Sequence, residues 1–262
     1  FFAPLAFILM LAMVPGMMRR WGQQEGRVLL RRIAWIAPAA LVAGWLGARL
    51  PGETPLLGAL AIILSVYVVL AHVDDVVRRS FAASAGPLRG LLQLPRGYKG
   101  MVLAHCGLAL TVAGIALVSY HEVERDMRLS PGESVEVAGY HFAFRELGQV
   151  RGPNYSALRG EFRVTREGRA ITVMHPEKRT YDASGKVMTE AAIDGGLLRD
   201  LYISLGEPLD KNKPMGAWAV RIYYKPGVRW LWLGALIMAL GGGLALSDKR
   251  YRRRTGTEEA AA

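Results

Sequence analysis

Hydrophobic residues gather in five stretches that are long enough, or nearly so, to cross a lipid bilayer. They cover residues 1–18, 33–50, 56–71, 101–120 and 228–246. A spanning helix needs roughly 20 predominantly apolar residues, so the third stretch is short for a span. The pattern predicts an α-helical integral membrane protein with five transmembrane helices.

Between the fourth and fifth stretches, hydrophobic and polar residues alternate along the chain. A period of two is typical of half-buried β-strands, and turn-forming glycines separate the alternating runs. We therefore expect a small all-β domain, an antiparallel sandwich or barrel, with one short helix over residues 195–205. The alternating hydrophobic positions are Tyr140, Phe142, Phe144, Phe162, Val164, Trp218, Val220, Ile222 and Tyr224.

These patterns divide the chain into six segments. They are three transmembrane helices (residues 1–72), a cytoplasmic link that is a hinge or an interfacial helix (73–100), a transmembrane helix (101–120), an outer β domain (121–227), a last transmembrane helix (228–247) and a basic cytoplasmic tail (248–262).

The net charge of +11 is unevenly distributed. Basic residues concentrate in residues 19–32, 73–100 and 247–262, whereas residues 121–227 hold 16 Lys/Arg against 15 Asp/Glu. Five spans would place the three basic segments on one face of the membrane and the balanced β domain on the other, as the positive-inside rule requires. Membrane orientation therefore explains the basicity better than nucleic-acid binding does, and the tail is interpreted as an orientation anchor.

His105 lies inside the fourth apolar stretch, where an ionisable side chain is costly and usually serves an ion path, a cofactor or a partner. On a helix it shares a face with Ala109, Val112, Ala113 and Ala116, which are small enough to admit a flat macrocycle or a closely packed helix. The residues alone leave three roles open for His105: hydrogen-bonded helix packing, ligation and proton relay.

The other four histidines have weaker claims to a ligand role. We expect His72, beside two aspartates at the inner surface, to be solvated. His121 is interpreted as structural or solvent-facing, and His141 as pointing outward. His175 has no metal-ligand partners at the right spacing, which argues against a zinc site.

Other chemical motifs are weak. Cys106 is the single cysteine, so no internal disulfide can form. We find no nucleophile with a neighbouring base, no phosphate loop and no carboxylate constellation, and therefore predict no complete active site in this chain.

Longer motifs carry a family resemblance. They include AHCGLALTVAGIA at residues 104–116, GPNYSALRGEFRVTREG at 152–168, MTEAAIDGGLLRDLYISLGE at 188–207 and WAVRIYYKPGVRWLW at 218–232. Together they resemble the C-terminal half of CcmF, a cytochrome c-type biogenesis (haem lyase) family. The resemblance is strong from about residue 95 to 254 and weaker over the first three spans.

The resemblance implies a part in covalent attachment of haem to apocytochrome c at the outer face of the bacterial inner membrane. It implies that His105 is an axial ligand of a membrane-embedded haem b. The second axial histidine and the tryptophan-rich haem-handling segment belong to the family's N-terminal half, which is not in this sequence. Expected partners are that N-terminal half or a subunit carrying it, a thiol-handling maturation subunit, a haem chaperone, apocytochrome c and membrane lipid, with no nucleic acid.

Within the β domain we single out five possible partner contacts, although surface solvation is the simpler role for each one. They are Asn154, Tyr155, Glu177, Lys178 and Arg179.

Two other functions stay open at this point. A haem-free scaffold could recruit maturation partners through the β domain alone. Half of a haem transporter is less favoured, because the second, third and fifth spans have almost no polar residues in their interiors. The chain opens on Phe1 without a basic leader, so we interpret it as a fragment rather than as beginning with a signal peptide.

Overall fold

The computed structural model describes residues 2–18, 26–82, 86–210, 212–213 and 215–248. It divides into two compact units, one made of Phe1–Tyr120 with Arg229–Ala262 and the other of His121–Val228. The expected tail beyond residue 248 lies outside the described residues.

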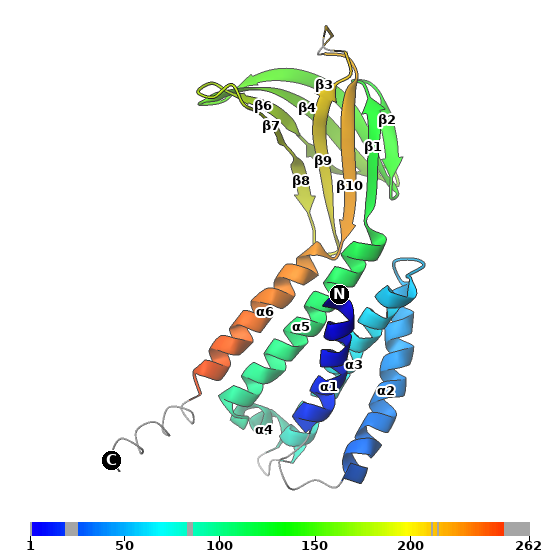
Figure 1. Cartoon of the computed structure of the whole chain (residues 1–262), viewed down its shortest axis with the longest axis vertical. Coiled ribbons are helices and arrows are strands. Elements are labelled where there is room, and N and C mark those ends of the chain that lie inside the picture. Colours follow the sequence, from blue (N-terminus) through cyan, green and yellow to red (C-terminus); the bar gives the residue numbers. More distant parts are fainter. Residues whose placement is uncertain (1, 19–25, 83–85, 211, 214, 249–262) are drawn as a thin grey trace, which may run out of the picture. The chain divides into compact units, whose positions relative to one another are not determined.

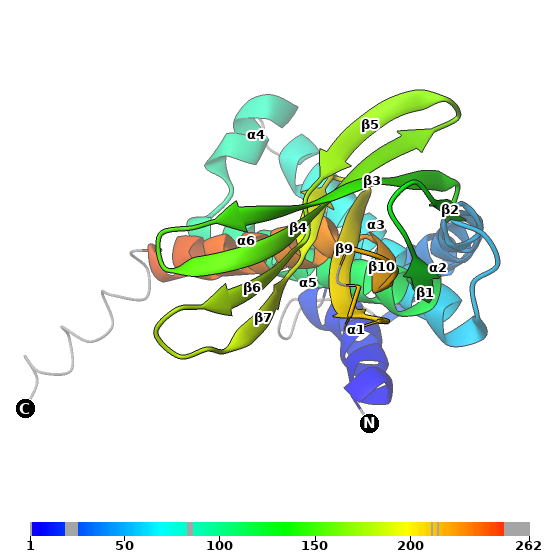
Figure 2. The same ribbon diagram turned by 90° about the horizontal axis from the view of Figure 1, so that it is seen from above.

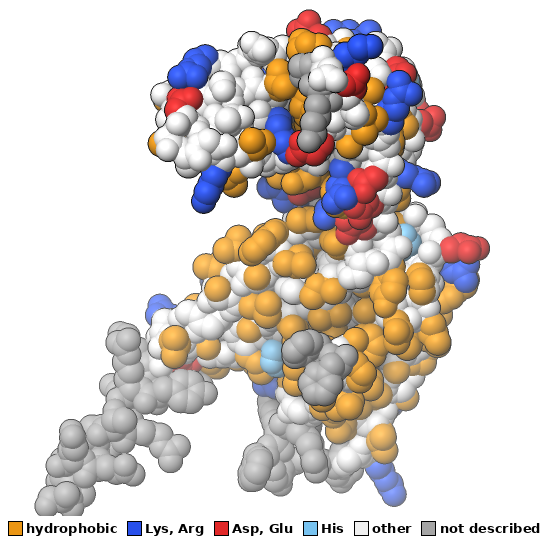
Figure 3. Space-filling view, turned by 45° about the horizontal axis from the view of Figure 1, so that its top comes forward, with side chains coloured by type: hydrophobic (Ala, Val, Ile, Leu, Met, Phe, Trp, Pro, Cys, Tyr) orange, Lys and Arg blue, Asp and Glu red, His pale blue; other side chains and the backbone are white. Residues whose placement is uncertain are grey.

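The first unit is helical (Figure 1). Four of its helices are long and apolar enough to span a membrane, and α1 is a shorter apolar helix. The five expected apolar helices are therefore present, joined by the short α4. The bounds are α1 Phe2–Met18, α2 Gly26–Arg49, α3 Leu56–Phe81, α4 Pro87–Gln93, α5 Arg96–His121 and α6 Val228–Leu246. Hydrophobic side chains dominate the visible surface of this unit in Figure 3, whereas charged side chains gather on the other.

The expected link over residues 73–100 is mostly helical among its described residues. Residues 73–81 continue α3, and α5 already begins at Arg96, so α4 and its short flanks are all that connect them. The prediction ended the third span at Ala71 because charged residues follow. In the structure Asp74 and Asp75 are paired with arginines, which allows the helix to carry them while buried.

The second unit contains two antiparallel sheets, in the strand orders β1-β10-β9-β8 and β2-β3-β4-β6-β7, with β5 pairing with β4 (Figure 2). Of the two expected folds, a sandwich or a barrel, the second unit is therefore a sandwich. The strands are β1 Val123–Leu129, β2 Ser134–Val137, β3 Tyr140–Arg151, β4 Tyr155–Arg166, β5 Arg169–Met174, β6 Glu177–Tyr181, β7 Val187–Glu190, β8 Ala192–Gly195, β9 Arg199–Pro208 and β10 Trp218–Pro226.

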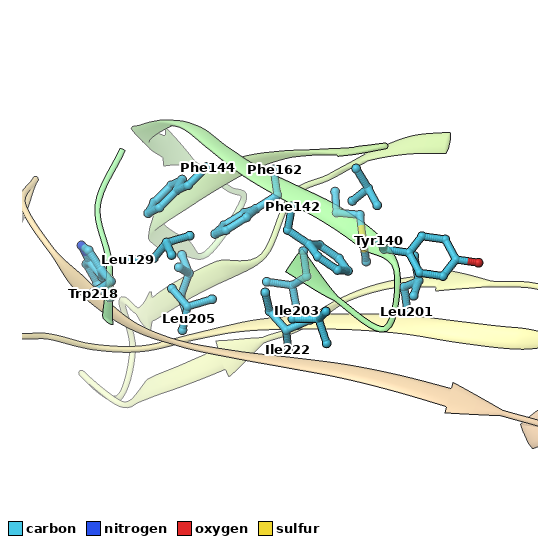
Figure 4. Packing of buried hydrophobic residues seen from close by; sticks show 14 of the residues in the cluster. Leu129, Tyr140, Phe142, Phe144, Phe162, Leu201, Ile203, Leu205, Trp218 and Ile222 are labelled. Atoms are coloured by element: carbon cyan, nitrogen blue, oxygen red, sulfur yellow. The ribbon is translucent and has the colours of Figure 1, made fainter. Parts of the chain in front are cut away.

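The sandwich core consists of the alternating hydrophobic residues that the sequence pattern predicted. Phe142 and Phe144 from one sheet face Ile203 and Leu205 from the other (Figure 4). The rings of Phe144 and Phe162 stack with centroids 4.4 Å apart. This face-to-face burial stabilises the unit, since burying a Phe or Leu side chain contributes about 1.5–3 kcal/mol.

Two hairpins are closed by two-residue turns in which both residues have positive φ. These are Ala138–Gly139 between β2 and β3, and Glu167–Gly168 between β4 and β5. Such turns match the twist of paired strands and favour glycine. Gly139 and Gly168 are therefore two of the turn-forming glycines that were predicted to separate the alternating runs.

The short helix expected over residues 195–205 is wrong, because β9 begins at Arg199. Leu201, Ile203 and Leu205 alternate into the core and are fully buried. The period-two pattern was present in the sequence, and sheet packing of these three side chains overrides the local helical propensity.

Glycines bring α5 and α6 into backbone contact. A Cβ atom added to Gly241 would lie 2.6 Å from the nitrogen of Ala104 and 2.6 Å from the carbonyl oxygen of Gly100. One added to Gly107 would lie 2.7 Å from the carbonyl oxygen of Gly234. Small residues at such interfaces let membrane helices approach closely.

We expect Gly241→Ala to loosen this helix pair and to lower the thermal unfolding temperature in detergent by several degrees, because the methyl group would collide with backbone atoms. Gly242→Ala is the matched control, since a Cβ atom there meets nothing within 4 Å. Circular dichroism at the helix band measures both variants. Equal unfolding temperatures would show that the contact does not stabilise the unit.

Candidate functional site

The candidate site is a pair of histidines within the helical unit, His105 on α5 and His72 on α3. Nδ1 of His105 lies 2.9 Å from Nε2 of His72. The two rings meet edge to face, with centroids 5.0 Å apart and an interplanar angle of 86°. A nitrogen–nitrogen distance of 2.9 Å is that of an ordinary hydrogen bond. If both rings are neutral, one nitrogen donates its proton and the other accepts it.

His72 is buried, which corrects the expectation that it is solvated at the inner surface. Its side chain has 0% exposure, and its Nδ1 lies 2.8 Å from the carbonyl oxygen of Val68, one turn earlier. His72 occupies this position because α3 continues for more than two further turns, to Phe81.

The small-residue face of α5 beyond His105 is used for helix packing. Ala109 packs in a cluster with residues of α1, α2 and α3, and Ala116 in one with residues of α2 and α3. Ala109 is 1% exposed and Ala116 3%. Of the two possibilities that the sequence left open for this face, the described residues show the closely packed helices.

The free nitrogen of His105 is accessible. Among the described residues, Ser80 Oγ is the only buried polar side-chain atom without a hydrogen-bond partner. Nε2 of His105 makes no hydrogen bond with a described residue either, so it cannot be fully buried. An accessible neutral imidazole nitrogen is the donor that haem iron takes from histidine, so His105 fits an axial ligand.

A buried charge network lies directly after His72 on α3. Arg32 of α2 approaches Asp74 at 2.7 Å and Asp75 at 3.0 Å. Tyr98 of α5 donates its hydroxyl hydrogen to Asp75 at 2.7 Å. The network joins α2, α3 and α5, and each carboxylate also pairs with an arginine four residues later on α3, Asp74 with Arg78 and Asp75 with Arg79.

Breaking one member of a buried ion pair costs about 3–5 kcal/mol, because it leaves an uncompensated charge. The network therefore fixes α3 against its neighbours, one turn from the histidine pair. This network was not predicted from the sequence. The signal was the spacing of four between Asp74 and Arg78 and between Asp75 and Arg79, which favours a continuing helix.

The five possible partner contacts in the sandwich prove to be mostly interconnected. Glu177 is 4% exposed, so the surface-solvation alternative is wrong for this residue. It accepts hydrogen bonds from Arg159 and Arg179. The guanidinium of Arg179 stacks over the ring of Tyr155 at 4.4 Å, and Lys178 binds Glu207 at 2.7 Å. Only Asn154 has an exposed side chain.

His141 and His175 belong to the sandwich unit. His141 is exposed on β3, as predicted, and Nε2 of His175 lies 3.8 Å from a carboxylate oxygen of Glu161. Within the described ranges, no group of three or more His, Cys, Asp or Glu side chains could hold a metal ion.

Comparisons with known proteins agree with this architecture. The family model described as "CcmF C-terminal beta-sandwich" matches residues 120–226, the second unit. The solved structure of "Cytochrome c Heme Lyase CcmF" aligns over 94% of this chain and 39% of its own, with a TM-score of 0.74 and 24% identity. That likeness shows the fold. The chain is thus a multi-pass membrane protein with a sandwich domain of this type.

Sequence relatives give the family. The chain is 43% identical to "Cytochrome c-type biogenesis protein CcmF" of Pseudomonas aeruginosa, over 98% of this chain and 38% of the relative. It is 52% identical to the Escherichia coli K12 protein of the same name, over 63% of this chain and 25% of the relative. The chain corresponds to the C-terminal region of the CcmF family and spans less than two fifths of the length of these relatives.

We expect Glu177→Gln to destabilise the sandwich at neutral pH by about 1–3 kcal/mol, because it removes the buried negative charge that accepts hydrogen bonds from Arg159 and Arg179. Burial raises the pKa of the Glu177 carboxyl, but hydrogen bonds from Arg179 and Arg159 outweigh burial and hold this pKa below its ordinary value. The ionised group therefore stabilises the fold above the unfolded-state pKa, and this contribution is lost as pH falls through the lowered folded-state pKa.

The stability difference between the original protein and Glu177→Gln should consequently be largest near pH 7 and shrink towards about pH 3. Thermal unfolding followed by near-ultraviolet circular dichroism at both pH values measures it. Glu207→Gln, whose carboxylate is 77% exposed, serves as the control and should change little. A difference that does not depend on pH would contradict the role of this carboxylate.

Proposed function

We propose that this chain is the C-terminal part of a haem-ligating membrane component that helps to attach haem covalently to apocytochrome c. The names of the relatives support the process, because they are cytochrome c-type biogenesis proteins. The observation that carries the role of this chain is the accessible Nε2 of His105, placed inside an apolar helix bundle.

We further propose that Nε2 of His105 binds the iron of a b-type haem as one axial ligand. When bound, such a haem supplies one-electron chemistry within the membrane. The chain's own contribution is to present a neutral imidazole whose other nitrogen is already hydrogen-bonded, and to hold α5 rigidly through its packing against α3 and α6. The second axial ligand would come from the N-terminal half of the protein or from a subunit that carries it.

The sandwich domain is proposed to lie on the periplasmic side of the bacterial inner membrane, with the C-terminus in the cytoplasm. The near balance of charge in residues 121–227, against basic residues in the loops of the other face, supports this orientation. There the domain would offer a docking surface to apocytochrome c, to a thiol-handling maturation subunit or to a haem chaperone.

A haem-free scaffold is the second candidate. The hydrogen bond between His72 and His105 favours it, because that bond satisfies a polar side chain in a helix interface without any ligand. Under this alternative the sandwich would recruit partners and the histidines would only pack α3 against α5.

The test is the haem content of the chain co-expressed with the N-terminal half of a CcmF protein and purified in detergent. We expect a b-type spectrum that is lost in His105→Ala and kept in His141→Ala, whose histidine is exposed on the sandwich. Size-exclusion chromatography checks that both variants fold. Full haem content in His105→Ala would overturn the ligand assignment and favour the scaffold.

A further inference from the structure

We propose that His72 is a positioning residue for His105: it fixes the His105 ring in the tautomer that leaves Nε2 free for iron, and it strengthens that nitrogen as a donor. This inference rests on the proposed haem ligation by His105. It follows from a series of hydrogen bonds that allows one assignment of protons when both rings are neutral.

The series of hydrogen bonds begins at the carbonyl oxygen of Val68, which can only accept a hydrogen bond. Nδ1 of His72, at 2.8 Å, must therefore carry a proton and donate it. A neutral imidazole has one donor and one acceptor nitrogen, so Nε2 of His72 is left as an acceptor.

The acceptor role of His72 Nε2 determines the proton position on His105 of α5. Since Nε2 of His72 can only accept, Nδ1 of His105, at 2.9 Å, must donate to it. The proton of His105 is then on Nδ1, and the lone pair is on Nε2. The backbone of α3 thus determines, through His72, which nitrogen of His105 is available to a metal. The opposite tautomer would place a proton on the accessible nitrogen and block ligation.

Burial makes this arrangement rigid. His72 is fully buried, its ring is held at one nitrogen by its own helix and at the other by His105, and the edge-to-face geometry fixes the angle between the rings. Metal-ligating histidines usually donate their second N–H to such a partner, which orients the ring and raises its basicity, and losing that partner typically weakens metal affinity 10–100-fold.

A role for His72 as the second iron ligand is disfavoured by the same distances. Metal–imidazole bonds are about 2 Å long, so iron between the two rings would need nitrogens about 4 Å apart. The separation found is 2.9 Å. Iron therefore has no place between these two nitrogens unless α3 and α5 move apart.

The experiment compares His72→Gln with His72→Leu in the chain co-expressed with the N-terminal half of a CcmF protein. The amide oxygen of Gln can replace Nε2 of His72 as the acceptor, whereas Leu fills the space without one. His141→Leu is the control for loss of a histidine. Size-exclusion chromatography reports folding, and His72→Met replaces the Leu variant if that variant does not fold.

The readouts are the rate of haem transfer to excess apomyoglobin and the midpoint potential of the bound haem. We expect His72→Leu to retain haem after purification, to release it about 10–100-fold faster and to have a higher midpoint potential, because a less basic imidazole stabilises ferric iron less. His72→Gln should lie near the original protein in both readouts.

Two results would overturn the proposal. Unchanged release and potential in His72→Leu would show that His72 only packs α3 against α5. Loss of one axial ligand in both variants, seen as a change to a five-coordinate spectrum, would make His72 a ligand itself. Failure of haem ligation by His105 is a separate outcome, because it appears as full haem content in His105→Ala.

Discussion

A polar group within an apolar helix bundle must find its hydrogen-bond partner inside the protein, because lipid offers none. This constraint explains how α3 is arranged. His72 bonds to its own backbone and to α5, and Asp75 bonds to α2, α5 and its own helix. Asp74 and Asp75 would mark the end of a span by hydropathy alone. In the structure they connect α3 to α2 and α5. The histidine pair lies one turn away and is held by the same framework.

Within the helical unit, helix packing and the proposed iron ligation use different parts of α5. Packing against α1, α2 and α3 uses the small-residue face of α5, and the glycines of α5 and α6 bring a further helix into backbone contact. Nε2 of His105 takes part in neither of these two packing contacts. The sandwich unit is stabilised independently, by its own aromatic and aliphatic core and by the buried carboxylate of Glu177.

Much of the fold could be predicted from the sequence, because long apolar stretches mark the membrane helices and a period of two marks many of the strands. Alternation placed Phe142, Phe162 and Ile222 in one core, and turn glycines marked the hairpins. Prediction failed for β9, where three alternating residues were assigned to a helix, and for the end of α3. There, hydropathy scores Asp74 as a solvent-exposed charge, although ion pairing across helices allows it to be buried.

His105 could be identified from its place in an apolar run and from a family motif. The partnership with His72 could not, because no local pattern states which face of α3 meets α5. The most direct test is ¹⁵N nuclear magnetic resonance of histidine-labelled chain without haem. Protonated Nδ1 in both rings, unprotonated Nε2 in His105 and a coupling across the Nδ1–Nε2 hydrogen bond are the predicted result. A protonated Nε2 in His105, or no coupling between the rings, would contradict the account.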